Sequence, residues 1–182
     1  MREENARRQN TTRRLVFSSL MIALGFTLSL FPGLSVPIGP TRVFPFQHMI
    51  NVLTGIILGP AYAAFIALAI GMLRIGFGTG TIFAISGGVP GAIVVGLVYH
   101  YVIKRDEVAL TEPLGTTVGA LISASLVAPF IGAAQLPSFL GLTIQWELYT
   151  IFFLLSSIPG AALGYILIKV LRRSGMIERL RL

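Results

Sequence analysis

The sequence predicts an all-α membrane protein, built as one bundle of six transmembrane helices with both termini in the cytoplasm. Hydrophobic residues make up 54% and charged residues 12% of the 182 residues, whereas about a quarter of a soluble domain is charged. The apolar stretches approach the roughly 20 residues that cross a hydrocarbon core of about 30 Å. All Lys and Arg residues except Arg42 and Arg74 fall on the face that this topology assigns to the cytoplasm, in agreement with the positive-inside rule.

The composition excludes several classes of protein. A mean hydropathy of +0.83 is incompatible with a soluble domain. The net charge of +7 lies in loops and terminal segments that flank apolar spans, so membrane topology explains it better than nucleic-acid binding does. Because the sequence contains no Cys, disulfides, thiolate metal sites and Cys nucleophiles are excluded together.

The six predicted spans are separated by short loops. Residues 1–14 form a basic cytoplasmic segment, and no small-residue cleavage pattern follows the first apolar run, which argues against a cleaved signal peptide. Pro and Gly residues between 32 and 40 break the helix and predict an outer loop. A single transmembrane domain, 15–173, is followed by the basic cytoplasmic tail 174–182. The predicted spans are residues 15–31, 46–59, 61–75, 87–103, 114–134 and 146–171.

Three spans carry local signals. In the first span, Ser19, Ala23 and Thr27 recur every four residues, and such ridges of small residues let helices approach closely in lipid. Pro129 in the fifth span is expected to kink or end its helix, because it cannot donate a backbone hydrogen bond. The last span begins with Trp146 and, three residues later, a tyrosine, as an interfacial aromatic belt would.

A group of polar residues marks the outer mouth of the second span. Gln47 and His48 lie four and three residues before Asn51, so a helix places all three on one patch, with Arg42 nearby in the preceding loop. We interpret the patch as a hydrogen-bonding wall for a ligand. The alternative is that His48 and Asn51 bond neighbouring helices and serve packing alone.

Arg74 lies near the outer end of an otherwise apolar span, where an unpaired charge is costly. It either contacts a ligand, pairs with Glu147, the one acidic residue predicted on that face, or extends its guanidinium to the interface. The Gly-rich stretch that follows offers Thr79 and Thr81 on backbone that can approach a ligand closely. Gln135 and Gln145 add polar groups around the last outer loop. The predicted substrate contacts are Arg42, Gln47, His48, Asn51, Arg74, Thr79, Thr81, Trp146, Glu147 and Tyr149.

Catalysis and cofactor binding find little support in the sequence. His48 and His100 lie on opposite predicted faces and cannot share a metal ion. The Gly-x-x-x-x-Gly-Lys-Ser/Thr phosphate loop is absent from the sequence, so this chain does not hydrolyse ATP by that machinery. A dyad of Ser86 with His48 stays open, because tertiary geometry decides such pairs. We expect no catalytic residue, metal or cofactor in this chain.

The run Phe44-Pro-Phe-Gln-His-Met-Ile-Asn-Val-Leu, continued by Gly55-Ile-Ile-Leu-Gly-Pro60, by Leu73-Arg74 and by Gly78-Thr-Gly-Thr, resembles the ThiW family. The resemblance covers nearly the whole chain. ThiW proteins are S components, the substrate-binding subunits of energy-coupling factor (ECF) transporters. The resemblance therefore implies a six-helix protein of the cell membrane that binds the thiamine precursor hydroxyethylthiazole near the outer face.

The resemblance also implies partners. An S component works with a membrane-embedded T component and with two ATP-binding-cassette ATPases, which use the ATP. Docking on the T component would involve the small residues of the first span, here Ser19, Ala23 and Thr27.

The candidate residues suit a neutral thiazole with an alcohol arm, which needs hydrogen-bond partners and aromatic walls such as Phe44, Phe46 and Trp146. Cationic thiamine suits them less, because Glu147 is the single candidate acid. Alternatives are an S component for another, anionic vitamin held by Arg42 and Arg74, a small membrane-embedded enzyme, and a purely structural subunit.

Overall fold

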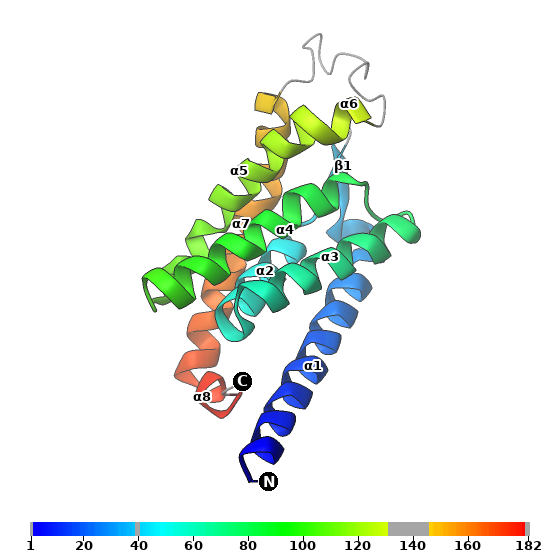
Figure 1. Cartoon of the computed structure of the whole chain (residues 1–182). Coiled ribbons are helices and arrows are strands. Elements are labelled where there is room, and N and C mark those ends of the chain that lie inside the picture. Colours follow the sequence, from blue (N-terminus) through cyan, green and yellow to red (C-terminus); the bar gives the residue numbers. More distant parts are fainter. Residues whose placement is uncertain (1, 39–40, 131–145, 181–182) are drawn as a thin grey trace.

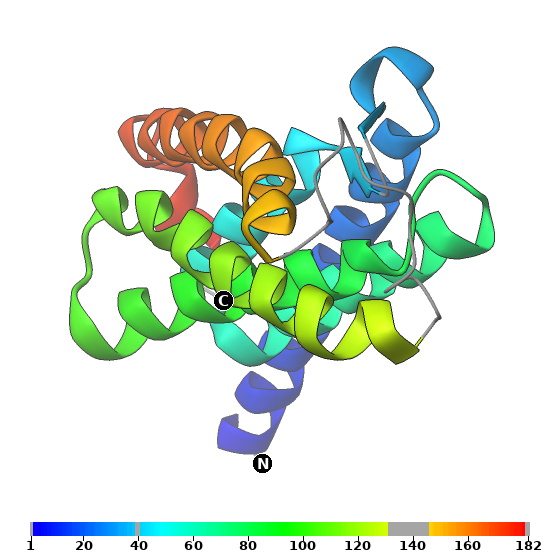
Figure 2. The same ribbon diagram turned by 90° about the horizontal axis from the view of Figure 1, so that it is seen from above.

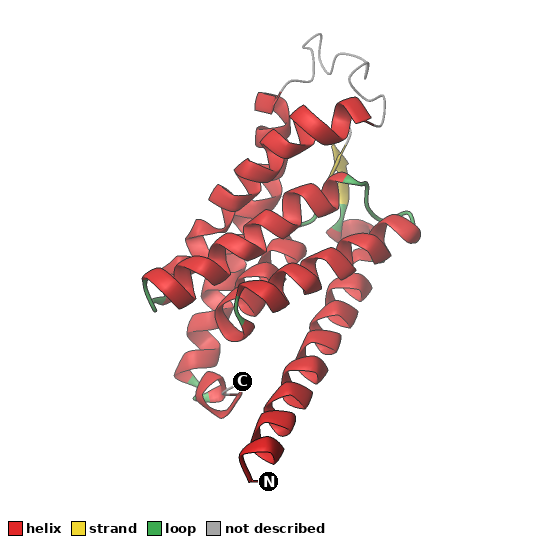
Figure 3. Ribbon diagram, viewed as in Figure 1, coloured by secondary structure: helices red, strands yellow, loops and turns green. Residues whose placement is uncertain are grey.

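The structure, a computed structural model, describes residues 2–38, 41–130 and 146–180, and nearly all of them are helical (Figures 1 and 3). The helices are α1 (Arg2–Ser29), α2 (Pro45–Leu58), α3 (Pro60–Gly76), α4 (Phe83–Leu97), α5 (Glu112–Ile122), α6 (Ala128–Phe130), α7 (Trp146–Arg173) and α8 (Met176–Leu180). Strands β1 (Val36–Ile38) and β2 (Thr41–Val43) form an antiparallel hairpin between α1 and α2. Short 3₁₀ helices cover Pro32–Leu34 and Asp106–Thr111, and π-helical turns cover Val98–Val102 and Ser123–Val127.

Three helical segments of the described chain are long and apolar enough to cross a membrane: Phe83–Val102, Asp106–Phe130 and Trp146–Arg173. They correspond to the fourth, fifth and sixth predicted spans. Helices α2 and α3 are apolar but only 14 and 17 residues long, shorter than the roughly 20 residues that a straight crossing takes. Helix α1 runs without interruption through the basic segment and most of the first predicted span.

Two predicted boundaries differ from the structure. Helix α4 begins at Phe83, four residues before the predicted start at 87. The glycines there are part of the helix and allow close packing, since Phe153 of α7 lies against Gly87. Helix α5 begins at Glu112, two residues before the predicted start of the fifth span, and Pro129 lies within the short helix α6. The π turn before Pro129 is where the backbone pattern changes, as expected next to a residue that cannot donate.

Helix α2 is the central element of the bundle and contacts α3, α4 and α7. Helix α1 packs on α3 and α2, and α5 packs on α4 and α7, so the bundle surrounds α2 (Figure 2). Pro45 starts α2, a position where its missing N–H costs nothing. The preceding Phe44 N–H donates to Ser156 Oγ of α7 at 2.8 Å. Gly160 of α7 lies so close to Pro45 O and His48 Cβ that a side chain there would collide with them. The start of α2 is thus held firmly against α7.

Candidate functional site

A cavity of about 30 Å³ lies at the start of α2, beneath the β1–β2 hairpin. Its walls come from β2, α2, α3, α4 and α7. The lining residues are Thr41, Arg42, Phe44, Gln47, His48, Arg74, Phe83, Ala84, Gly87, Gly88, Phe152, Phe153 and Ser156. Four predicted contacts, Arg42, Gln47, His48 and Arg74, are therefore brought together around one space. A volume of this size has room for about one water molecule, so a ring-sized ligand requires some lining side chains to move.

Arg74 forms one side of this site. Its side chain is buried, with 3% of the residue exposed, and its Cζ lies 4.3 Å from the centre of the Phe44 ring, a cation–π contact. Nη1 donates to Gln47 Oε1 at 3.2 Å, and Nη2 donates to the Thr79 carbonyl at 3.4 Å. The Nε donor has no hydrogen-bond partner among the described residues. The Nε atom is enclosed beside Gly80, so a ligand acceptor reaches it only when the packing there moves.

The alternative partner of Arg74, Glu147, is exposed at the start of α7, and no ion pair joins the two within the described chain. Arg42 is the second cation of the site, and its Nη1 donates to the Gly78 carbonyl at 3.4 Å. Two guanidinium groups therefore line the cavity, and among the described residues neither is paired with a carboxylate.

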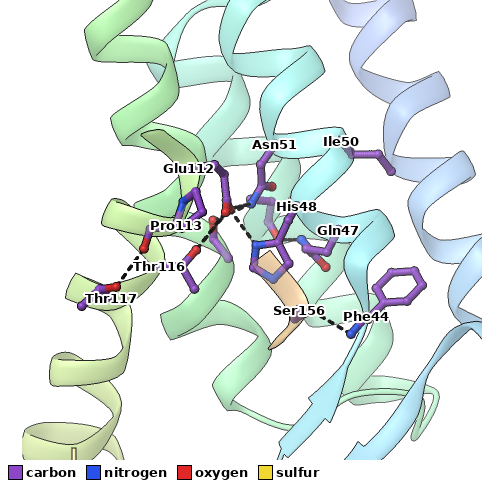
Figure 4. Close-up of polar contacts among 12 residues, drawn as sticks. Phe44, Gln47, His48, Ile50, Asn51, Glu112, Pro113, Thr116, Thr117 and Ser156 are labelled. Atoms are coloured by element: carbon purple, nitrogen blue, oxygen red, sulfur yellow. Dashed lines mark hydrogen bonds and ion pairs between the residues drawn. The ribbon is translucent and has the colours of Figure 1, made fainter. Parts of the chain in front are cut away.

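The predicted polar patch on α2 is divided between two sides of the helix. Gln47 faces α3, where it accepts from Arg74 and donates to the Ala67 carbonyl at 3.3 Å. His48 and Asn51 instead face α5 (Figure 4). Gln47 and His48 both line the cavity, whereas Asn51 does not and bonds Gly88 and Glu112 instead.

Glu112 is the acceptor that His48 and Asn51 share, and it is fully buried, with 0% of the residue exposed. His48 Nδ1 lies 2.7 Å from Glu112 Oε1, and Asn51 Nδ2 donates to the same oxygen at 3.0 Å. Thr116, one turn along α5, donates to Oε2 at 3.1 Å. Figure 4 shows these three side chains around the carboxylate. The fifth span was predicted to begin at residue 114, which leaves Glu112 in the preceding loop, whereas in the structure α5 begins at Glu112.

The signal for Glu112 lies in its surroundings in the sequence. Glu-Pro is a typical helix start, because an acidic side chain favours the first turn and Pro is well tolerated there. On that basis a helix beginning at Glu112, with Thr116 on the same face, could have been predicted. Gly91 of α4 gives the carboxylate its space, since a Cβ there would collide with Glu112 Oε1 and Thr116 Oγ1.

The remaining predicted contacts do not line the cavity. Thr79 contacts the backbone of Arg74 and helix α1, because its hydroxyl lies within hydrogen-bond distance of the Arg74 carbonyl and of Ser29 Oγ. The Thr81 hydroxyl is buried without a partner among the described residues. Trp146 is 47% exposed, as an interfacial residue would be.

Tyr149 was expected in the same interfacial belt and is instead fully buried between Phe83 and Phe153. The reason is that α7 turns this side chain into the aromatic core shared with α4. Gln135 and Gln145, expected near the site, lie outside the described residues.

The possible dyad of Ser86 with His48 is not formed. Ser86 Oγ lies 2.6 Å from Ser123 Oγ, while His48 is bonded to Glu112. The second histidine, His100, is exposed in the π-helical turn that follows α4. The cavity thus offers binding groups: two cations, an imidazole, an amide and aromatic walls.

The model of a protein family described as thiamine-precursor transporter protein (ThiW) matches residues 15–174. The chain belongs to the ThiW family. This confirms the resemblance drawn from the Phe44–Pro60 run. A comparison with curated proteins finds no match. ThiW membership, together with the three membrane-length helices, identifies a membrane transport protein for a thiamine precursor, with a small molecule as its substrate.

Proposed function

We propose that this ThiW protein is the S component of an ECF transporter and captures hydroxyethylthiazole at the outer face of the cell membrane. The observation that carries the proposal is the cavity, which Arg74 lines on one side and His48 on another. Hydroxyethylthiazole has a matching pair of groups, since its ring nitrogen accepts a hydrogen bond and its alcohol can donate one. Phe44, Phe152 and Phe153 supply apolar walls for the ring.

In this proposal the chain crosses the membrane six times, with both termini in the cytoplasm. The cavity then opens toward the outside, because the β1–β2 hairpin and the start of α2 lie at the end opposite the basic segments. The shorter helices α2 and α3 sit within the bundle, where protein partly replaces lipid as their surroundings.

The proposal assigns the energy for uptake to partner subunits, a T component and two ATPases, and assigns no cofactor to this chain. The pattern of buried and exposed residues on helix α1 supports docking on a T component. Met21 and Gly25 are buried against the bundle, whereas Ser19, Ala23 and Thr27 are exposed on another side. An exposed stripe of small residues allows a second membrane helix to approach closely.

The test is ligand binding by the purified chain. Hydroxyethylthiazole, thiamine and the pyrimidine precursor of thiamine are titrated separately by calorimetry, and we expect binding confined to the thiazole. His48→Gln should weaken binding, and His100→Gln, which changes an exposed histidine, is the matched control. Absence of thiazole binding by a folded chain would contradict the substrate assignment. Unchanged thiazole uptake in cells that lack the gene and have no other route would contradict the transport role.

A second candidate substrate is a small anionic vitamin. The observation in its favour is that Arg42 and Arg74 both line the cavity without a carboxylate partner among the described residues. Paired arginines bind carboxylates tightly and with defined geometry. Carboxylate-bearing vitamins in the same titration decide between the two, because only one class should bind tightly.

A further inference from the structure

The bond between His48 and Glu112 determines which ring nitrogen of His48 carries the hydrogen. Glu112 Oε1 lies 3.0 Å from Asn51 Nδ2, and an amide nitrogen can only donate. The Asn51 amide orientation is itself fixed, because Nδ2 also donates to the Gly88 carbonyl at 2.9 Å. Glu112 Oε1 therefore accepts from Asn51, and with the carboxyl group ionised both of its oxygens only accept, so that His48 Nδ1 supplies the hydrogen for the 2.7 Å contact.

The second ring nitrogen, Nε2, then faces the cavity side of the site. Within the described chain it has no hydrogen-bond partner, and it is not among the fully enclosed polar atoms. In Figure 4 the ring lies between Glu112 and the Phe44–Ser156 contact at the start of α2. His48 lines the cavity, so Nε2 is available to a bound molecule.

Arg42 and Arg74 line the same space as His48, and Glu112 lies against the other side of the imidazole ring. A neutral ring with hydrogen on Nδ1 has a lone pair on Nε2. The nitrogen that the ligand meets is then an acceptor.

We propose that Glu112 is a positioning residue that holds His48 in the Nδ1–H tautomer, so that Nε2 accepts a hydrogen bond from a hydroxyl of the ligand. The inference rests on the proposed function, since it assigns the ring nitrogen and the alcohol of the thiazole to different residues of the cavity. Arg74 donates to the ring nitrogen, and His48 accepts from the alcohol. The site is thereby selective for ligands that carry a hydrogen-bond donor on their side arm.

Glu112 does not serve as a direct ligand contact in this arrangement. Its two oxygens are occupied by His48, Asn51 and Thr116, and Glu112 is absent from the cavity wall. Its effect on binding passes through the imidazole. A residue of this kind is distinguished from a merely structural one by ligand selectivity and not by affinity alone.

The first experiment compares three ligands on the wild-type chain: hydroxyethylthiazole, its methyl ether, and the analogue with a plain ethyl arm. Only the first can donate to Nε2. We expect it to bind at least about tenfold more tightly than the other two, since a buried acceptor left unpaired is costly. Equal binding of the alcohol and the methyl ether would overturn the proposal.

The second experiment changes Glu112. Glu112→Gln keeps an acceptor oxygen beside Nδ1 and should keep the preference for the alcohol. Glu112→Met has similar length and no strong acceptor, so the ring can change tautomer and the ratio of alcohol to ether affinity should fall toward one. Glu107→Gln and Glu107→Met, at an exposed acid near the same helix start, are the matched controls and should leave the ratio unchanged. An unchanged ratio in a folded Glu112→Met variant would overturn the proposal.

The third experiment measures the His48 tautomer by NMR in the ligand-free protein. Its one variant, His48→Gln, serves to assign the signals. In ¹⁵N-His-labelled protein the His48 signals, assigned through their loss in His48→Gln, should show a protonated Nδ1 and a non-protonated Nε2. A protonated Nε2 would overturn the inference whatever the substrate is. If the tautomer is as expected but no thiazole binds, the proposed substrate fails and the positioning role of Glu112 stands.

Discussion

Arg74→Gln separates ligand binding from packing at the outer end of α3. In the ligand-free protein the substitution removes the cation–π contact with Phe44, worth about 1–2 kcal/mol when desolvated. It also removes the bond to Gln47, worth about 1.5 kcal/mol for a charged donor. The substitution also removes the cost of burying a charged guanidinium, which is several kcal/mol for a residue that is 3% exposed. Because these effects are of similar size and opposite sign, we expect little change in thermal stability.

The effect on binding should be larger and depends on the ligand. A neutral thiazole loses one hydrogen bond from a charged donor, about 1.5 kcal/mol, which is roughly a tenfold rise in Kd. An anionic ligand loses a buried ion pair, about 3–5 kcal/mol and thus a rise of several hundredfold or more. The size of the loss therefore reports the charge of the group beside Arg74.

The assay is calorimetric titration of the wild-type and Arg74→Gln chains in detergent, with the melting temperature of each recorded without ligand. Arg105→Gln, which removes an exposed arginine at the opposite end of the bundle, is the control for net charge. A Kd within twofold of wild type for Arg74→Gln would refute the assignment of Arg74 to the site. Collapse of the ligand-free protein would refute the estimate that its buried contacts and its desolvation nearly cancel.

Three further predictions concern other parts of the bundle. Gly91→Ala should destabilise the chain by about 1–3 kcal/mol in thermal unfolding, because its Cβ meets Glu112 and Thr116, while Gly33→Ala, with open space around it, should not. Ser19→Leu should reduce transport by the complete transporter and leave ligand affinity of the isolated chain unchanged. Arg172→Gln removes bonds to Asp106 and Tyr99 far from the cavity; it should lower stability by about 0.5–1 kcal/mol without a change in Kd, since the pair is partly exposed.

The sequence predicted a helical membrane protein and selected four residues that line the cavity. Hydropathy and the distribution of charge identify membrane helices from local composition alone, and the structure contains helices in all six predicted regions. The cavity lies where polar residues interrupt an apolar helix start, because such residues are costly in lipid and persist where they have partners. Arg42, Gln47, His48 and Arg74 could be selected on that ground.

The partners of these residues could not be predicted, because they depend on how helices distant in sequence are rotated against each other. Glu112 is 64 positions from His48, and its neighbours Asp106 and Glu107 make it look like part of a charged loop. Tyr149 was misplaced for a related reason. An aromatic residue at the predicted end of a span has the same local signal whether it faces the interface or the core, and only the rotation of α7 decides.

The first turn of α2 connects the two polar halves of the site. Gln47 bonds Arg74 of α3, and the next residue, His48, bonds Glu112 of α5. A ligand that bridges Arg74 and His48 would add a second link between α3 and α5 across the cavity, beside the one that passes through α2. Since the volume of the cavity is close to that of one water molecule, the ligand must displace cavity-lining side chains as it forms this link. Binding should therefore change the packing around the start of α2, which is the part of the bundle that the hairpin covers and that α7 holds through Ser156 and Gly160.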